Sequence, residues 1–126
     1  MAGKIVADTL EHSTAGSVDT QYVVNGSAKS WNTIDGDAVS PVLDSLNVTS
    51  TTDNGNGDYT VAFASAMNNA LYTITQSANR LQNNNSPIVI GTDTPATGSY
   101  TEYWWSSAFS ATNPHRAWSV VHGDLA

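Results

Sequence analysis

The chain has 126 residues and a mass of 13.3 kDa, which fits one domain and leaves little room for a second. Its 11 acidic side chains outnumber 4 basic ones, so it lacks the Lys/Arg clusters with which nucleic-acid binders neutralise phosphates. The absence of Cys excludes a disulfide scaffold, thiol catalysis and Cys-ligated metal, and no apolar run approaches the roughly 18 residues of a membrane span.

Leu, Glu and Lys are scarce while β-branched Thr and Val abound, which argues against a helical bundle. The aromatic residues lie in segments of alternating polarity, which argues against disorder of the whole chain. The composition therefore predicts a small, acidic, all-β protein.

Residues 1–20 show no sustained period of two and no helical stripe. We predict an extended N-terminal arm and connector that docks on a partner through Ile5, Val6 and Leu10; a frayed terminus is the alternative. Lys4 is followed by too few apolar residues for a secretory signal, so we expect a protein that stays in a cytoplasm or leaves it by cell lysis.

Residues 21–126 are predicted to form the β domain. In residues 21–34, two short apolar runs flank Asn25-Gly26-Ser27, which predicts a strand, a tight turn and a second strand. Residues 42–76 contain three alternating segments separated by turn formers, and they predict a three-stranded meander.

The remaining elements are loops at 77–86 and 92–98, a short strand at 87–91 and a last strand at 116–122. Residues 99–111 are predicted as a long strand with a bulge or bend near Trp104 and Trp105. Seven to nine short strands fit an antiparallel β-sandwich or a jelly-roll-like domain.

The aromatic residues near the C-terminus are the main candidate site. Two successive Trp residues on a strand point to opposite faces, so at least one of them leaves the core. An exposed Trp serves either a subunit interface or stacking on a sugar ring, and both uses stay open. A place in the core or at an interface is favoured over stacking on a ligand. The set comprises Tyr100, Tyr103, Trp104, Trp105 and Trp118.

The sequence predicts no catalytic residue. A glycosidase needs two carboxylates facing each other across a bond, and Glu102 is the only Glu outside the arm. The Asp residues mostly stand beside Gly, Asn or Thr, where they serve turns. A glycan hydrolase that rests on Glu102 is the disfavoured alternative.

No metal site and no cofactor are predicted either. Residues 53–58 resemble a calcium loop only superficially, because Gly55 and Gly57 stand where ligands should be, and a hairpin loop is predicted instead. The histidines form no His-x-His pair, since His115 and His122 are seven residues apart.

Three stretches carry a family resemblance: VNGSAKSWNTIDG (24–36), LDSLNVTSTTDNGNGDYTVAF (43–63) and SAMNNALYTI (65–74). They resemble a module of bacteriophage structural proteins, especially the tail-fibre-type proteins of marine phages. The resemblance covers about residues 3–76, and residues 77–126 match only loosely. The family strand usually begins Arg-Asp-Ser, where this chain has Leu43-Asp44-Ser45. The module marks a fold and supplies no catalytic residue.

The resemblance implies a non-enzymatic virion protein, homotrimeric and surface-exposed, of tail-fibre or host-attachment type. Its expected partners are other copies of itself, tail or capsid proteins and a host surface glycan. Such a protein assembles in the host cytoplasm and leaves by lysis. Because the chain is too short for a complete long fibre, a capsid decoration protein that clips onto the major capsid protein stays open, as does a carbohydrate-binding module.

Overall fold

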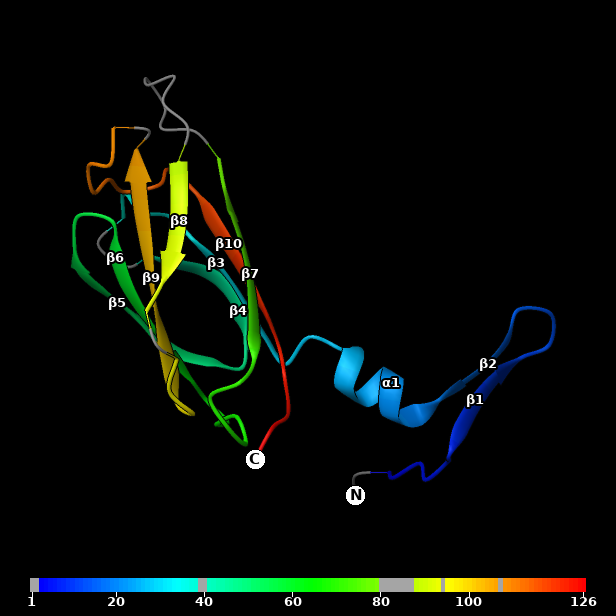
Figure 1. Ribbon diagram of the computed structural model, residues 1–126. Coiled ribbons are helices and arrows are strands. Elements are labelled where there is room, and N and C mark those ends of the chain that lie inside the picture. Colours follow the sequence, from blue (N-terminus) through cyan, green and yellow to red (C-terminus); the bar gives the residue numbers. More distant parts are fainter. Residues whose placement is uncertain (1–2, 39–40, 80–87, 94, 107) are drawn as a thin grey trace.

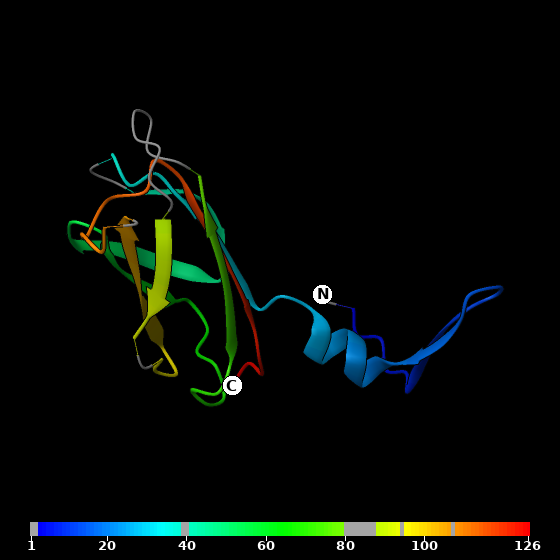
Figure 2. The same ribbon diagram turned by 45° about the horizontal axis from the view of Figure 1, so that its top comes forward.

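The computed structural model describes residues 3–38, 41–79, 88–93, 95–106 and 108–126. Two four-stranded antiparallel sheets face each other as a sandwich, and the N-terminal segment projects from its side (Figure 1). Figure 2 shows the projecting N-terminal segment and the sandwich from a second angle. The prediction of an all-β sandwich is confirmed.

Each sheet joins strands that are distant in the sequence. The first, here the β9 sheet, has the order β5 (Val48–Gly55), β6 (Asp58–Phe63), β9 (Ser99–Ser106) and β8 (Ile88–Thr92). The second, here the β10 sheet, has the order β4 (Val42–Leu46), β3 (Ser30–Ile34), β10 (Ala117–His122) and β7 (Thr73–Ala78).

The core contains two apolar clusters, and a polar layer lies between them. One cluster comprises Val61, Phe63, Met67, Tyr72, Tyr100 and Val121, and the other comprises Ile34, Tyr59, Trp104 and Ala117. Four strands each contribute one inward-facing polar residue at the level between the two apolar clusters. These residues are Asn32, Gln76, Glu102 and Ser119. Alternation along the strands therefore produces apolar, polar and apolar levels within one sandwich.

The predicted meander is wrong in its third strand. β5 and β6 form the expected hairpin, but β7 pairs with β10 in the opposite sheet. Residues 64–72 connect β6 of one sheet with β7 of the other. At the end of this connection, the Tyr72 hydroxyl donates at 2.9 Å to the carbonyls of Ala96 and Ser99, next to the start of β9. Alternation had indicated which face of β7 is buried, but it contains no information about the pairing partner.

The segment expected as the first strand of the meander divides into β4 and β5 at Asn47. Asn47 has a φ of 54°, a left-handed conformation that Asn adopts more readily than most residues. Its Nδ2 donates to the Ser65 carbonyl at 3.1 Å, and its Oδ1 accepts from the Ser65 amide at 2.6 Å. These bonds hold the corner at which the chain passes from the β10 sheet to the β9 sheet.

The N-terminal segment has more regular structure than an extended arm. It contains β1 (Thr9–His12), β2 (Gly16–Asp19) and α1 (Thr20–Gly26), and none of the residues in these elements is buried. The predicted turn at Asn25-Gly26 is wrong, because these residues end a helix whose Val23 carbonyl accepts from the Ser27 amide at 3.1 Å. β3 pairs instead with β4 and β10, which leaves residues 21–24 without a strand partner.

The three C-terminal strands lie close to where the sequence predicts them. β8 and β10 confirm the two short strands, although Pro87 and most of the predicted 77–86 loop lie outside the described residues. β9 pairs in regular register with β6 and β8, so there is no bulge at Trp104 and Trp105, and the strand ends at Ser106. Through the two Trp residues the unbroken pairing is with β8, where Ile90 lies opposite Trp104 and Val89 opposite Trp105.

We expect Gly57→Ala to lower the free energy of unfolding by roughly 2–4 kcal/mol, since it combines backbone strain with overpacking. Gly57 has a φ of 72°, and a Cβ there would lie 2.5 Å from the Trp104 carbonyl oxygen and 2.8 Å from the Thr112 amide. Urea unfolding measures the loss. Gly98→Ala is the control for the added methyl group, because Gly98 has no positive φ and a Cβ there meets nothing within 4 Å. Equal losses in the two variants would contradict the close approach.

Candidate functional site

The predicted aromatic set divides between the core and the surface. Tyr100, Glu102 and Trp104 of β9 point inward, while Tyr103 and Trp105 lie half-buried on the outer face. The exposed fractions of Tyr100 and Trp104 are 2% and 0%, so the proposal that they contact a ligand or a subunit must be corrected. The expectation that one of the two successive Trp residues leaves the core is met by Trp105.

Tyr103 and Trp105 form a stacked aromatic pair on the outer face of the β9 sheet. Their ring centroids are 5.6 Å apart and their planes differ by 18°. Gly91 of β8 lies opposite Tyr103 in the ladder, and a Cβ there would come within 2.6 Å of Trp105 Cζ3. The Trp105 indole therefore lies over Gly91, where a side chain would displace it. Tyr103, Trp105 and Gly91 are called the aromatic platform below.

Polar side chains of β5 and β6 continue this face beside the platform. Asp58 lies opposite Tyr103 in the β6–β9 ladder. Asn54 Nδ2 donates to Asp58 Oδ1 at 3.0 Å and to Thr60 Oγ1 at 2.8 Å. Thr60 Oγ1 also lies 3.3 Å from Thr101 Oγ1. Hydroxyl, amide and carboxylate groups thus stand in fixed positions next to two aromatic rings.

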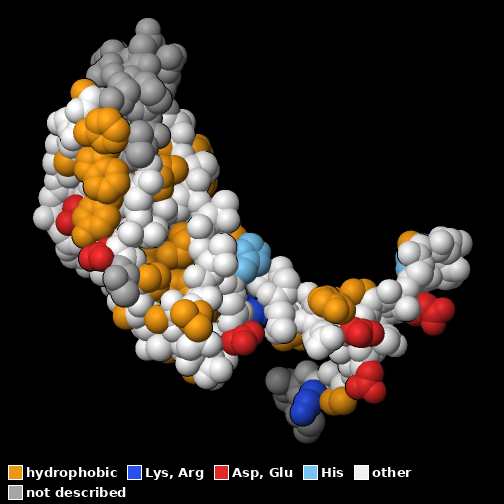
Figure 3. All heavy atoms as spheres, in the orientation of Figure 1, with side chains coloured by type: hydrophobic (Ala, Val, Ile, Leu, Met, Phe, Trp, Pro, Cys, Tyr) orange, Lys and Arg blue, Asp and Glu red, His pale blue; other side chains and the backbone are white. Residues whose placement is uncertain are grey.

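Two carboxylates act on the Tyr103 phenol. Its pKa is raised, first by partial burial, then by the charges of Asp58 and Asp93, and by a hydrogen bond with Asp93. Figure 3 shows hydrophobic side chains in a row along β9, with acidic side chains beside the lower end of the row. The platform is therefore flanked by negative charge.

Trp118, the fifth residue of the predicted set, lies on the other side of the molecule. It is 38% exposed on the outer face of the β10 sheet, between Thr33 of β3 and Ser77 of β7. Val120 shares its face and pairs with Trp31, which in turn pairs with the exposed Leu46. Trp118, Val120, Trp31 and Leu46 thus place four large apolar side chains on this face.

The residues predicted to dock on a partner are all exposed. The exposed fractions of Ile5, Val6 and Leu10 are 91%, 80% and 47%. Together with Val23 and Val24 of α1, they line one shallow hollow in the N-terminal segment. Their docking on a partner stays a prediction.

Glu102 lies at the centre of the buried polar layer, beyond the reach of a surface ligand. Its Oε2 accepts a hydrogen bond from Gln76 Nε2 at 2.8 Å, and its Oε1 has no partner among the described residues. Burial raises the pKa of this carboxyl to about 7; the Gln76 bond and the nearby Trp104 indole oppose the rise. The Trp104 N–H is close enough to act on the carboxyl, although it forms no geometrically good hydrogen bond.

Further hydrogen bonds link the rest of the polar layer. The Tyr100 hydroxyl lies 2.6 Å from Ser119 Oγ, which also bonds Asn32 Oδ1. Burial and the Glu102 charge raise the pKa of Tyr100 well above its ordinary value. These contacts connect β9 with β10 and β3 across the sandwich, so the layer has a structural role.

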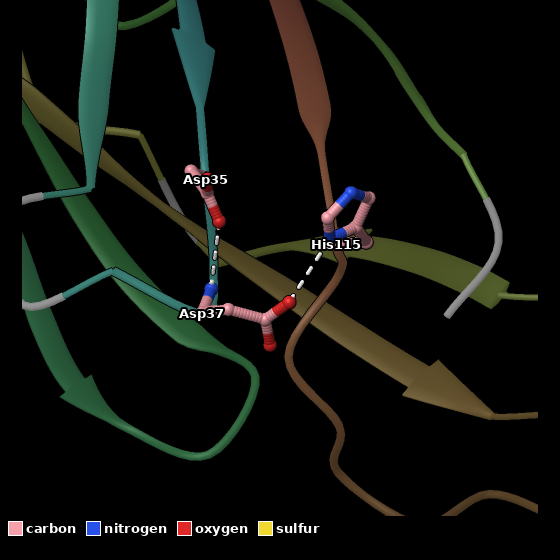
Figure 4. A group of neighbouring side chains, drawn as sticks. All are labelled: Asp35, Asp37 and His115. Atoms are coloured by element: carbon pink, nitrogen blue, oxygen red, sulfur yellow. Dashed lines mark hydrogen bonds and ion pairs between the residues drawn. The ribbon is translucent and has the colours of Figure 1, made fainter. Parts of the chain in front are cut away.

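One side-chain cluster has donor groups suited to a metal ion. Asp35, Asp37 and His115 bring their ligand atoms within 4.8 Å of one another (Figure 4). The Asp37 amide donates to Asp35 Oδ1 at 3.1 Å, and His115 Nδ1 lies 3.0 Å from Asp37 Oδ2. A local turn and a hydrogen bond account for this arrangement without a metal. Sequence spacing could not indicate the cluster, because His115 is 78 positions from Asp37.

Comparison with known proteins gives a structural likeness. No protein-family model matches the chain, and neither does any curated protein. The fold is similar to part of the phiAB6 tailspike, which was crystallised with three-repeated oligosaccharides of Acinetobacter baumannii surface polysaccharide. The TM-score is 0.57 and the identity is 13%, over 92% of this chain and 23% of the tailspike chain. The two proteins therefore share a β-sandwich fold, and this chain spans less than a quarter of the tailspike's length.

No helix among the described residues is long or apolar enough to cross a membrane.

Proposed function

We propose that the protein is a non-enzymatic phage virion component of tail-fibre or host-attachment type, exposed on the particle. Two independent likenesses support this proposal. Residues 3–76 resemble a phage structural module in sequence, and 92% of the chain shares its fold with part of a tailspike. The protein then assembles in the host cytoplasm and reaches the medium by lysis, as part of the virion.

The stacked pair Tyr103 and Trp105 carries the more specific proposal that the protein binds a host surface glycan. A sugar ring offers an apolar C–H face, which an aromatic ring covers, and hydroxyls at its rim, which polar side chains bind. The stacked rings of the platform, with centroids 5.6 Å apart, supply the aromatic surface. Asp58, Asn54 and Thr60 supply the polar side chains. The oligosaccharides bound to the tailspike are of the same chemical class.

Binding to an array of bacterial surface oligosaccharides tests the glycan proposal. Wild-type protein is expected to bind members of the array, and Gly91→Ala to bind them more weakly, because its Cβ would displace the Trp105 indole. Gly98→Ala is the matched control, since a Cβ there meets nothing within 4 Å. Equal binding by both variants would contradict a site on the platform.

Catalysis by Glu102 is not part of the proposed function. A catalytic carboxyl must contact the substrate, whereas Glu102 is 1% exposed and bonded to Gln76 between the sheets. We expect surface polysaccharide to keep its chain length after long incubation with the protein, as measured by size exclusion. Progressive shortening would contradict a purely binding role.

We further propose a homotrimer that is held together by the apolar surfaces away from the platform. Trp118 and Leu46 are exposed on the β10 sheet, and the N-terminal segment leaves Ile5 and Val6 uncovered. Light scattering after size exclusion is expected to give three times the chain mass of 13.3 kDa. A monomer would contradict the trimer in solution and favour a single carbohydrate-binding module.

Capsid decoration remains the second candidate, because the exposed Ile5, Val6 and Leu10 are suited to clipping onto a capsid subunit. Residues 1–20 contribute no strand to either sheet of the sandwich, so deleting them is expected to leave both sheets intact. The truncated protein is expected to lose attachment to virions while retaining the glycan binding of the full chain. Attachment that survives the deletion would contradict a docking role for the segment.

A further inference from the structure

We infer that the aromatic platform selects uncharged glycans and rejects those that carry a carboxylate or phosphate at the stacking sugar. This inference rests on the proposed glycan-binding function and adds the chemical class of the ligand. It follows from the charges and hydrogen-bonding groups around Tyr103.

Both charged groups that act on the Tyr103 ring are negative. Asp58 lies opposite it on β6, and Asp93 follows β8 and bonds the phenol. Among the described residues, the basic side chains are elsewhere: Lys4 lies in the N-terminal segment, Lys29 lies between α1 and β3 with its amide bonded to Val121 of β10, and Arg116 precedes β10 and pairs with Asn79. An anion placed on the platform therefore meets two like charges and no compensating cation from the described chain.

The hydrogen-bonding groups point to the same class of ligand. Carboxylates accept hydrogen bonds and cannot donate them, so a ligand group that bonds Asp58 or Asp93 must be a donor. Asn54 already occupies Asp58 Oδ1, while Oδ2 carries no hydrogen bond from a described residue. Sugar hydroxyls are donors, whereas a carboxylate or phosphate on the sugar offers only acceptors. Charge and hydrogen-bonding capacity thus discriminate against the same glycans.

An array of acidic bacterial surface oligosaccharides, each printed beside its carboxyl-reduced form, tests the selectivity. Reduction removes the charge and leaves the sugar backbone unchanged. Wild-type protein is expected to bind the reduced forms about five- to tenfold more tightly, as expected for repulsion by two partly exposed charges. Because salt screens such charges, the ratio is expected to shrink at high ionic strength.

The double variant Asp58→Asn and Asp93→Asn is expected to bring the ratio close to one. Asp44→Asn on the exposed face of β4 is the matched control and is expected to leave the ratio unchanged. The selectivity would be overturned if the acidic forms bound as tightly as the reduced forms or more tightly. Loss of that binding in Trp105→Ala would show that the platform still binds glycan. Failure of both forms to bind would overturn the proposed glycan binding and the selectivity together.

Discussion

Between pH 4.5 and about pH 8, the wild-type protein is expected to lose about 3 kcal/mol of unfolding free energy that a Glu102→Gln variant keeps. Glu102 is 1% exposed, and burial raises its pKa from 4.5 to about 7 in the folded chain. Over this interval the folded state binds more protons than the unfolded state. Stability therefore falls as pH rises, and the loss is complete once pH exceeds the folded pKa.

Urea unfolding of wild type and Glu102→Gln at a series of pH values measures the effect. The difference between the two proteins isolates Glu102, because both contain the other acidic side chains. Gln has nearly the same shape and stays neutral, and its amide oxygen can still accept from Gln76 Nε2. Parallel stability curves over this pH range would contradict a buried carboxyl with a raised pKa.

Alanine substitutions at the two adjacent Trp residues are expected to differ: one mainly lowers stability and the other mainly abolishes glycan binding. Trp104→Ala removes a fully buried indole from the Ile34 and Tyr59 cluster and should lower the unfolding free energy by roughly 3–5 kcal/mol. Trp105→Ala removes an indole from the surface and should lower it by only about 1 kcal/mol. Glycan binding should be lost in the Trp105 variant, because the stacking surface is removed.

Urea unfolding and titration with the array oligosaccharides together separate these effects. Trp118→Ala is the matched control, since it removes an exposed Trp from the other sheet and should leave glycan binding intact. Retained binding in Trp105→Ala, or its loss in Trp118→Ala, would contradict the position of the site. A large stability loss in Trp105→Ala would make that residue part of the fold.

Alternation in the sequence predicts the inward and outward faces of β6 and β7 correctly. Tyr59, Val61 and Phe63 are buried as their spacing indicates, because a period of two is a property of each strand alone. The pairing of β7 with β10 depends on a crossover through residues 64–72, which the same spacing does not encode. The left-handed corner at Asn47 likewise lies inside a run that alternates without interruption.

The candidate site could be predicted only in part. The sequence indicates that Trp104 and Trp105 lie on opposite faces of the strand. Alternation alone does not indicate which of the two faces is buried. The structure decides it by placing Trp104 against Ile34 and Trp105 over Gly91, a residue 14 positions earlier that carries no chemical signal of its own. Asp58 lies beside Tyr103 because β6 pairs with β9, and the sequence does not predict this pairing either.

Glycan binding on the face of Tyr103 and Trp105 can be tested directly through the indole groups. The chain has four Trp residues, whose indole N–H signals can be followed separately by NMR and assigned with single Trp→Phe variants. During titration with an array-selected oligosaccharide, the Trp105 signal is predicted to shift while the signals of Trp31, Trp104 and Trp118 stay in place. A shift confined to Trp118 and Trp31 would place the ligand on the β10 sheet and contradict this account.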